Sequence, residues 1–390
     1  MGVDDTTVRN ISNDICTGCA LCANLCPVDA IVMKQNDKGF AHPSVNDEAC
    51  IQCGLCLKKC PVSGVCQAIS TEAPIGVFAA YSLDEATRYE STSGGLFTEL
   101  AKPFIKNGGI VIGAAYDEDY TIYHTYAKNE QQLAALRQSK YAQSDKRLIY
   151  RFALSEMDAG RQVMFCGAPC ETAAMKAFAE GNSGRLTVVD FLCLGVNSPA
   201  VYRAYLDELE SSEGSKVSKI WFKNKEHGWN SFGTRVEFDN RNIYFGDRQT
   251  DPFMRGYIVH PLFIRESCTQ CRFKSIPHAS DLTFGDFWGI EKIIPKIDSF
   301  HGVSMALINT KKGLDLFEAA KDRLYWQKVS FDESIVSDNK NALIQSVALD
   351  SESKRFYQEL SKFGFTKAIT RCASDSLPSR LKRKLRRLLA

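Results

Sequence analysis

Two copies of one cysteine pattern stand near the start of the chain, and they constrain its fold more than any other feature. Residues 16–27 read CTGCALCANLCP and residues 50–61 read CIQCGLCLKKCP, so both runs have the spacing C-x2-C-x2-C-x3-C-P. The two-residue spacings wrap three thiolates around one inorganic cube, and the fourth cysteine starts a helical turn that points toward a second cube. The repeated pattern therefore predicts a pair of 4Fe–4S clusters.

The fourth cysteine of each run is expected to bind the cube of the other run. One cluster is predicted on Cys16, Cys19, Cys22 and Cys60. The other is predicted on Cys50, Cys53, Cys56 and Cys26. A pair of zinc knuckles is the alternative, but zinc usually takes its sulfurs from two CxxC pairs and has no use for the third cysteine and the proline. Residues 1–70 are interpreted as a small two-cluster domain of the bacterial ferredoxin type.

The remaining composition is that of a soluble globular protein with reduced thiols. The chain has 390 residues, 15 cysteines and a net charge of +2. This length suits two domains, and the small charge gives no reason to expect nucleic acid. There is no long apolar run and no signal-peptide pattern, so a cytoplasmic metalloprotein is expected. Cys66 is interpreted as a buried thiol, and no role is predicted for Cys166 or Cys372.

From about residue 76 onward, strand and helix patterns alternate. Strands are expected at 75–82, 110–117, 161–166, 186–193, 281–290 and 303–313. Helices are expected at 91–109, 129–137, 145–160, 168–181 and 198–212, with an antiparallel excursion at 216–245. Such alternation predicts an α/β fold with a mostly parallel sheet. The expected domains are thus 1–70, 76–340 and a helical C-terminal segment, 341–390.

Four cysteines outside the N-terminal runs are predicted to share one site. Cys170 follows the strand at 161–166, and Cys193 ends the strand at 186–193. Both strands of a strand–helix–strand unit end at the same edge of the sheet, where α/β proteins bind ligands. The pair Cys268 and Cys271, in the segment RESCTQCRFK, would complete a third 4Fe–4S cluster. The alternative is four unrelated core thiols, since free cysteine is often buried.

Six segments together resemble a known family. They are STSGGLFTEL (91–100), SKYAQS (139–144), FCGAPC (165–170), DFLCLGVNSP (190–199), CTQC (268–271) and SDLTFGDFWG (280–289). In this order they are similar to the coenzyme F420 hydrogenase/dehydrogenase beta-subunit family, over roughly residues 76–310. The resemblance implies an FAD-containing iron–sulfur electron-transfer protein. Many bacterial relatives carry two ferredoxin clusters in front and are associated with surface-polysaccharide clusters.

The resemblance also implies flavin contacts. They are Ser93, Gly94, Gly95, Ser139, Lys140 and Tyr141. The glycines open a helix, where free N–H groups suit a pyrophosphate, and Lys140 is expected to counter a phosphate or the charge of a reduced flavin. The alternatives are an ordinary helix start and a solvated lysine.

The sequence departs from many relatives at Leu194, where they have histidine, and at Ala168, where they have threonine. These departures put a shared substrate in doubt. Four residues are candidates for the pocket wall or, alternatively, for turn and core positions: Asp286, Trp288, His227 and Trp229. No general acid is predicted.

The first functional hypothesis is an oxidoreductase that passes electrons from the clusters through FAD to an organic substrate, in polysaccharide biosynthesis if the resemblance extends that far. The second is an electron-relay subunit without its own substrate, and the third is a coenzyme F420 oxidoreductase. The expected partners are a redox protein such as ferredoxin and a small molecule. The tail LPSRLKRKLRRLLA (377–390) predicts a peripheral docking element for an anionic membrane or acidic partner, or else a solvated helix end.

Overall fold

The computed structural model describes residues 6–63, 73–274, 276–336 and 340–373. Its N-terminal module contains α1 (Leu21–Leu25), β1 (Ile31–Gln35), β2 (Ala41–Val45) and α2 (Leu55–Lys58). The N-cap residue of each short helix, Ala20 or Gly54, is in the left-handed conformation and directly follows the second cysteine of its run. A small core of Val8, Ala30, Ile31 and three cysteine side chains holds the module together.

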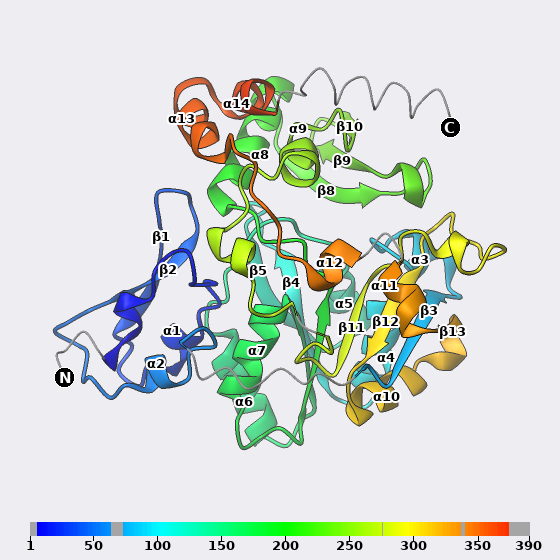
Figure 1. Ribbon diagram of the computed structural model, residues 1–390, viewed down its shortest axis with the longest axis horizontal. Coiled ribbons are helices and arrows are strands. Elements are labelled where there is room, and N and C mark those ends of the chain that lie inside the picture. The colour runs from blue at the N-terminus through cyan, green and yellow to red at the C-terminus, as the bar shows by residue number, and fades with distance from the viewer. Residues whose placement is uncertain (1–5, 64–72, 275, 337–339, 374–390) are drawn as a thin grey trace.

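The main body of the chain forms one eight-stranded sheet (Figure 1). In spatial order its strands are β13 (Leu324–Val329), β3 (Gly76–Ser82), β12 (Ser304–Ile308), β11 (Leu282–Asp286), β7 (Leu186–Phe191), β6 (Val163–Gly167), β4 (Ile110–Tyr116) and β5 (Ile122–Ala127). The sequence pattern predicted six of these strands, and β5 and β13 were not predicted. The predicted α/β class is confirmed.

The sheet is mixed and not mostly parallel as predicted, and its parallel part is central. β11, β7, β6 and β4 run parallel, whereas β12, β3 and β13 pair antiparallel on one side and β5 on the other. A parallel connection needs a crossover helix, and only a short 3-10 turn, η6 (Ile290–Lys292), lies between β11 and β12. The four parallel strands end at one edge, as the strand–helix alternation predicted.

Helices cover both faces of this sheet. α4 (Leu96–Lys106), α5 (Glu130–Leu136) and α10 (Lys311–Glu318) share a core with Val111 and Ala115 of β4. α6 (Ile149–Asp158) and α7 (Pro169–Phe178) share another core with Ile110 and Ile112 of the same strand. Alternate residues of a strand point to opposite faces, so two helical layers sandwich the sheet. Shorter helices, α3 (Glu85–Tyr89), α11 (Phe331–Val336) and α12 (Lys340–Ile344), complete this body.

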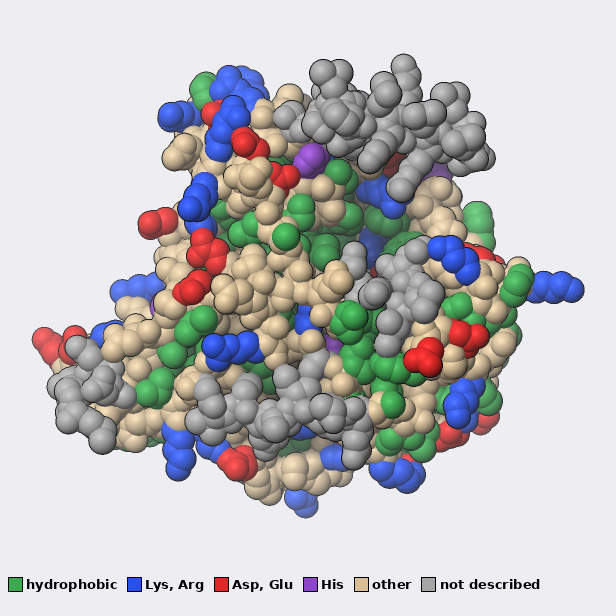
Figure 2. Space-filling view, viewed as in Figure 1, with side chains coloured by type: hydrophobic (Ala, Val, Ile, Leu, Met, Phe, Trp, Pro, Cys, Tyr) green, Lys and Arg blue, Asp and Glu red, His purple; other side chains and the backbone are tan. Residues whose placement is uncertain are grey.

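The predicted excursion is a separate three-stranded antiparallel sheet of β8 (Val217–Asn224), β9 (Gly233–Phe238) and β10 (Ile243–Asp247). It packs with α8 (Pro199–Glu213), α9 (Pro252–Met254), α13 (Ser353–Phe363) and α14 (Phe365–Cys372). Figure 1 places this unit above the large sheet. Figure 2 shows hydrophobic side chains gathered in the middle of the same face, below the lobe of α13 and α14.

Two sequence predictions fall on residues that the structure does not describe. The basic tail and the thiol of Cys66 lie outside the described ranges. Among the described helices, none is both long and apolar enough to cross a membrane. Cys372, for which no role was predicted, is buried in the core shared by α13, α14 and the small sheet.

Candidate functional site: three sulfur sets and a cavity

The first sulfur set joins the two N-terminal runs. Around the Cys22 thiol, burial and the neighbouring sulfurs of Cys19, Cys16 and Cys60 all raise its pKa. Burial likewise raises the pKa of Cys60 to about 11, and Cys19 and Cys16 add to that effect. The structure therefore gathers the four sulfurs that the crossed pairing assigned to one cube, although their role as ligands remains a prediction.

The second sulfur set lines a small pocket at the outer end of the module. Its cysteines are Cys26, Cys50, Cys53 and Cys56. The backbone N–H of Ala30 donates to Cys26 Sγ at 3.2 Å, a contact that lowers the energy of a thiolate ligand. Cys53 is exposed, and Val28 and Ile51 beside it are 40% and 60% exposed. This set is the most accessible of the three.

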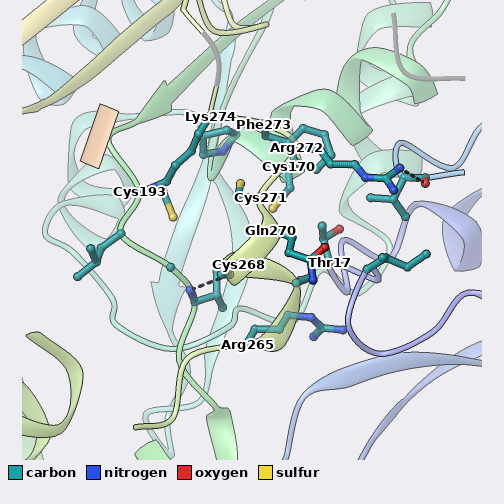
Figure 3. A pocket seen from close by; sticks show the side chains of 17 residues that line it. Thr17, Cys170, Cys193, Arg265, Cys268, Gln270, Cys271, Arg272, Phe273 and Lys274 are labelled. Carbon is teal, nitrogen blue, oxygen red and sulfur yellow. Dashed lines mark hydrogen bonds between the residues drawn. The ribbon is translucent and has the colours of Figure 1, made fainter. Parts of the chain in front are cut away.

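The third sulfur set forms where four segments meet at the ends of the parallel strands. Figure 3 shows the side chains of Cys170, Cys193, Cys268 and Cys271 around one space. Cys170 lies in the first turn of α7, Cys193 follows β7, and the other two come from the 3-10 turn η5 (Glu266–Gln270) and the residue after it. The N–H of Val196 donates to Cys268 Sγ at 3.5 Å.

The donor arrangement fits iron–sulfur cubes better than single ions. Within the described residues, no group of three or more His, Cys, Asp or Glu side chains could hold one metal ion. Four thiolates on one zinc lie close together, because each Zn–S bond is about 2.3 Å, whereas the corners of a cube spread them apart. Burial, with the charges of Glu171 and Cys193, raises the pKa of Cys170 well above its ordinary value.

A buried arginine joins the module to the third sulfur set. Arg265 is 2% exposed and donates to the carbonyl oxygens of Cys16 at 2.7 Å and Ala41 at 2.9 Å. It also donates to Gln143 Oε1 at 3.1 Å, and Gln143 in turn accepts from the N–H of Ala41. Arg265 lines the pocket of the third set, so a single planar cation fixes that pocket against the first cysteine run.

Tyr150 makes a second link between the two sulfur sets. Its hydroxyl donates to the carbonyl oxygen of Cys19 at 2.9 Å. Burial raises its pKa first, and the nearby Cys19, Glu171 and Cys170 raise it further. One side chain therefore lies close to a sulfur of the first set and to a sulfur of the third.

Next to the third set lies a cavity of about 840 Å³, well within the range of small-molecule and cofactor sites. It extends from the N-terminus of α4, past the parallel strand ends, to the underside of the small sheet. Cys193 and Leu194 belong to its wall, and Cys193 also belongs to the third sulfur set. Cys193 is thus the cysteine that the third sulfur set shares with the cavity wall.

Five of the six predicted flavin contacts line this cavity. They are Ser93, Gly95, Ser139, Lys140 and Tyr141. Gly94 is not in the wall: a Cβ on it would lie 2.6 Å from the carbonyl oxygen of Ala80, so its lack of a side chain lets the loop approach the sheet. Gly95 has φ +87° and precedes α4 without a side-chain cap, which leaves the first N–H groups of that helix available to an anion.

The ammonium of Lys140, predicted to contact the flavin, is hydrogen-bonded to the backbone. Its ammonium donates to the carbonyl oxygen of Ala135 at 3.0 Å and to that of Arg137, at the end of α5. Burial lowers the pKa of Lys140 to about 7. The side chain lines the cavity, but two of the three protons of its ammonium are already donated in hydrogen bonds to backbone carbonyls.

Three polar atoms in the cavity wall lack a partner. They are buried without a hydrogen bond to any part of the chain that the structure describes: Thr98 Oγ1, Arg137 Nε and Asn197 Oδ1. An unpaired buried donor or acceptor costs about 1–3 kcal/mol. One donor and one acceptor on the same wall suit a bound molecule that offers both kinds of polar atom.

A polar network that the sequence did not predict includes three residues of the cavity wall: His124, Ser144 and Glu171. Lys146 is 1% exposed and pairs with Glu171 at 2.5 Å, while Ser144 accepts from the same ammonium at 2.6 Å. His124 contacts Ser144 Oγ at 2.8 Å and the Cys166 carbonyl at 3.2 Å. Burial, followed by the charge of Lys146, lowers the pKa of His124 to about 3, so the ring is neutral and its 3.7 Å contact with Glu171 is no ion pair.

The four wall-or-core candidates divide evenly. Asp286 and Trp288 line the cavity, whereas Trp229 and His227 do not. Trp229 is buried, stacks on Trp288 with ring centroids 4.1 Å apart and donates to Asp286 Oδ1 at 3.0 Å. The two positions that depart from relatives, Leu194 and Ala168, both lie in the wall.

The comparisons with known proteins agree with the two-part organisation. Residues 15–64 match the 4Fe–4S dicluster domain, and residues 160–334 match the C-terminal part of the coenzyme F420 hydrogenase/dehydrogenase beta-subunit family. No curated protein matches the chain. Among solved structures, a chain of the F420-reducing NiFe hydrogenase complex from Methanosarcina barkeri is similar, with 17% identity and a TM-score of 0.48, covering 76% of this chain and 95% of that one. The chain is thus similar, over residues 160–334, to the C-terminal part of the coenzyme F420 hydrogenase/dehydrogenase beta subunit, behind a two-cluster 4Fe–4S domain.

Proposed function

We propose that this protein is an iron–sulfur flavoprotein oxidoreductase that passes electrons from 4Fe–4S clusters through FAD to an organic substrate. The observation that carries the proposal is the double membership of Cys193, which belongs both to the third sulfur set and to the wall of the large cavity. A redox centre on those sulfurs would touch a molecule in the cavity directly.

FAD fits the cavity on three features of the chain. The uncapped start of α4 suits its pyrophosphate, and Arg137 Nε and Asn197 Oδ1 offer an unpaired donor and acceptor for its polar atoms. Leu136, Phe97 and Phe284 give the wall apolar surface for a flat ring. When bound there, a flavin would supply the conversion between single electrons and a two-electron transfer.

The clusters would be held by the three sulfur sets. Cys193 and its three partners form the inner set, and Arg265 and Tyr150 fix it against the first cysteine run. The second set has the exposed Cys53 and the exposed apolar side chains of Val28 and Ile51 around it. This surface suits a small one-electron carrier protein such as a ferredoxin as the electron donor.

The extent of the cavity supports this function over that of a pure relay. A relay subunit passes electrons between partners and needs no enclosed space beside its inner redox centre. Here the cavity extends from the uncapped start of α4 to Lys223, Asp286 and Trp288. These three residues are more than a hundred positions after α4 in the sequence. That extent supports a second, substrate-binding part of the cavity.

The test is anaerobic purification with FAD, followed by addition of reduced ferredoxin. The proposal predicts a stoichiometric flavin spectrum that bleaches, and recovers when a two-electron acceptor is added. The acceptors to screen are deazaflavin coenzyme, keto sugars and quinones, which also separates the use of coenzyme F420 from other substrates. Protein that retains its iron but never retains flavin would favour the relay subunit instead.

A further inference from the structure

The end of β8 carries a backbone irregularity at the cavity. Lys223 has φ +54°, a left-handed conformation that a lysine seldom adopts, and the pairing of β8 with β9 shifts register between Trp221 and Asn224. An unstrained strand would place side chains alternately on its two faces. A bulge of this kind re-aims one side chain, and local strain of about 1–3 kcal/mol persists where the surrounding structure holds it for a purpose.

The side chain that the bulge re-aims is a buried cation. Lys223 is 8% exposed, lines the cavity and forms an ion pair with Asp286, which ends β11 at the edge of the sheet. Burial disfavours the charge of Lys223, but Asp286 and then Tyr141 outweigh burial and leave its pKa above the ordinary value. Trp229 Nε1 donates to the other oxygen of Asp286, so the carboxylate is held from two sides.

Tyr141 completes a short donor chain. Tyr141 and Lys223 both line the cavity and interact electrostatically, and burial raises the pKa of Tyr141, so the phenol keeps its proton. The ring packs edge-on to Phe222, with centroids 5.3 Å apart, and lies 5.2 Å from the ring of Tyr257. An ammonium has three protons, and the ion pair with Asp286 occupies one of them. A remaining proton of Lys223 and the proton of Tyr141 can therefore meet a ligand oxygen in the cavity.

This end of the cavity differs from the end at α4. Lys223, Asn230 and Phe232 come from the small antiparallel sheet and its connecting loop, and Trp288 faces them. Phe232 and Trp288 lie near Lys223, with ring centroids 5.3 and 5.2 Å from its Nζ. Around Lys223 the wall is thus aromatic beside a buried cation, which suits a ligand with an unsaturated, oxygen-bearing group.

We propose that Tyr141 and Lys223, positioned by Asp286, form an oxyanion-binding site that recognises the carbonyl oxygen of the substrate, and that the Tyr141 phenol protonates that oxygen. This inference rests on the proposed function, since the reduced flavin is the hydride donor. The carbonyl carbon gains a C–H bond from the hydride as the C=O π bond breaks, and the oxygen gains an O–H bond as the O–H bond of Tyr141 breaks. The carbonyl is reduced to an alcohol and the flavin is oxidised. Lys223 returns a proton to the tyrosinate and regains one from water.

The test uses 4-nitrophenol as the probe, because its phenolate absorbs visible light and presents an anionic oxygen on a flat ring. Binding is measured by absorbance with the anaerobically purified full chain, with and without FAD. The expected result is that K223M and Y141F each weaken binding of the phenolate about tenfold or more, the loss typical of one hydrogen bond to a charged group. K292M removes one positive charge from the wall outside the donor chain and is expected to weaken binding less than threefold.

Three results would overturn the assignment. The first is that K223M and Y141F bind the phenolate within threefold of the unaltered protein. The second is that K292M weakens phenolate binding as much as they do. The third is that loading with FAD abolishes phenolate binding, which would show that the flavin occupies the site. Y141F removes a single oxygen, so its result stands even if K223M does not fold. Protein that takes up no FAD but shows the expected phenolate pattern would remove the proposed function and leave the oxyanion-binding site in place.

Discussion

The N-terminal module and the α/β body both collect cysteines, but they do so by different physical routes. In the module, eight cysteines fall within residues 16–60, and two-residue loops and two short helices bring them together. In the body, the four cysteines are far apart in the sequence. Cys170 and Cys193 follow the parallel strands β6 and β7, and the pair at 268 and 271 comes from η5 and the residue after it. The first arrangement is local, whereas the second is a property of the completed sheet. Loss of the sulfur set in the body should therefore leave the two sets of the module intact, and the reverse.

The largest expected effect follows from removing one sulfur from each region. If three cubes are present, the protein holds about twelve irons per chain, four for each cube. C193A should hold about eight and lose flavin bleaching by reduced ferredoxin, because the lost cube is the one that touches the cavity. C53A should also lose about four irons, but the third cube should remain. An iron content of C193A equal to that of the unaltered protein would show that this set binds no cluster.

The next effect concerns the buried ion pair of Lys146 and Glu171 at the cavity wall. K146M leaves Glu171 buried without its cation, and breaking such a pair costs about 3–5 kcal/mol of unfolding free energy. K311M, which breaks an exposed pair with Asp315 on α10, should cost less than about 1 kcal/mol and serves as the control. Urea unfolding under anaerobic conditions measures both. Equal stability of the two variants would contradict the buried pair.

A smaller effect is expected at the joint between the two regions. R265M removes the donors that reach Cys16, Ala41 and Gln143, and should cost about 2–3 kcal/mol, the range of one or two hydrogen bonds to a charged group. R265K keeps the charge but not the planar fork, so it should recover only part of the loss. Limited proteolysis between the module and the body should be faster in R265M. Identical proteolysis and unfolding in all three proteins would show that Arg265 does not join the regions.

The smallest effect is a pH dependence confined to the body. The unfolded chain protonates His124 below its ordinary pKa of 6.5, whereas burial holds the folded pKa at about 3. The unfolded state then binds more protons between these values, so stability falls as the pH falls through this window. From pH 7 to 5.5 His124 should account for about 1 kcal/mol of lost stability. H124N should lack that component, and an unchanged pH slope in H124N would contradict it.

The sequence predicted what depends on short spacing or on strand direction. The cysteine runs specify their loops, and the alternation of strand and helix was enough to place Cys170 and Cys193 at one sheet edge. Lys223, Arg265 and Lys146 escaped prediction because each acts through partners in distant segments. No local pattern distinguishes such a lysine or arginine from an exposed one, although Arg265 stands three residues before a cysteine pair that was singled out.

The antiparallel strands were missed or misdirected for a related reason. β5 and β13 lie at the two ends of the sheet order, and β12 and β3 read as buried strands without showing their direction. Hydrophobic pattern reports burial, and strand direction depends on the connection. The absence of a long helix between β11 and β12 was the available signal.

The most direct measurement of the central claim is an anaerobic reductive titration of the purified, FAD-supplemented chain. Three cubes that each accept one electron and a flavin that accepts two should consume about five electron equivalents per chain. Visible bleaching should include the flavin band. Consumption of about two equivalents with no flavin band would mean that the module alone is redox-active, and would contradict a line of centres that ends in the cavity.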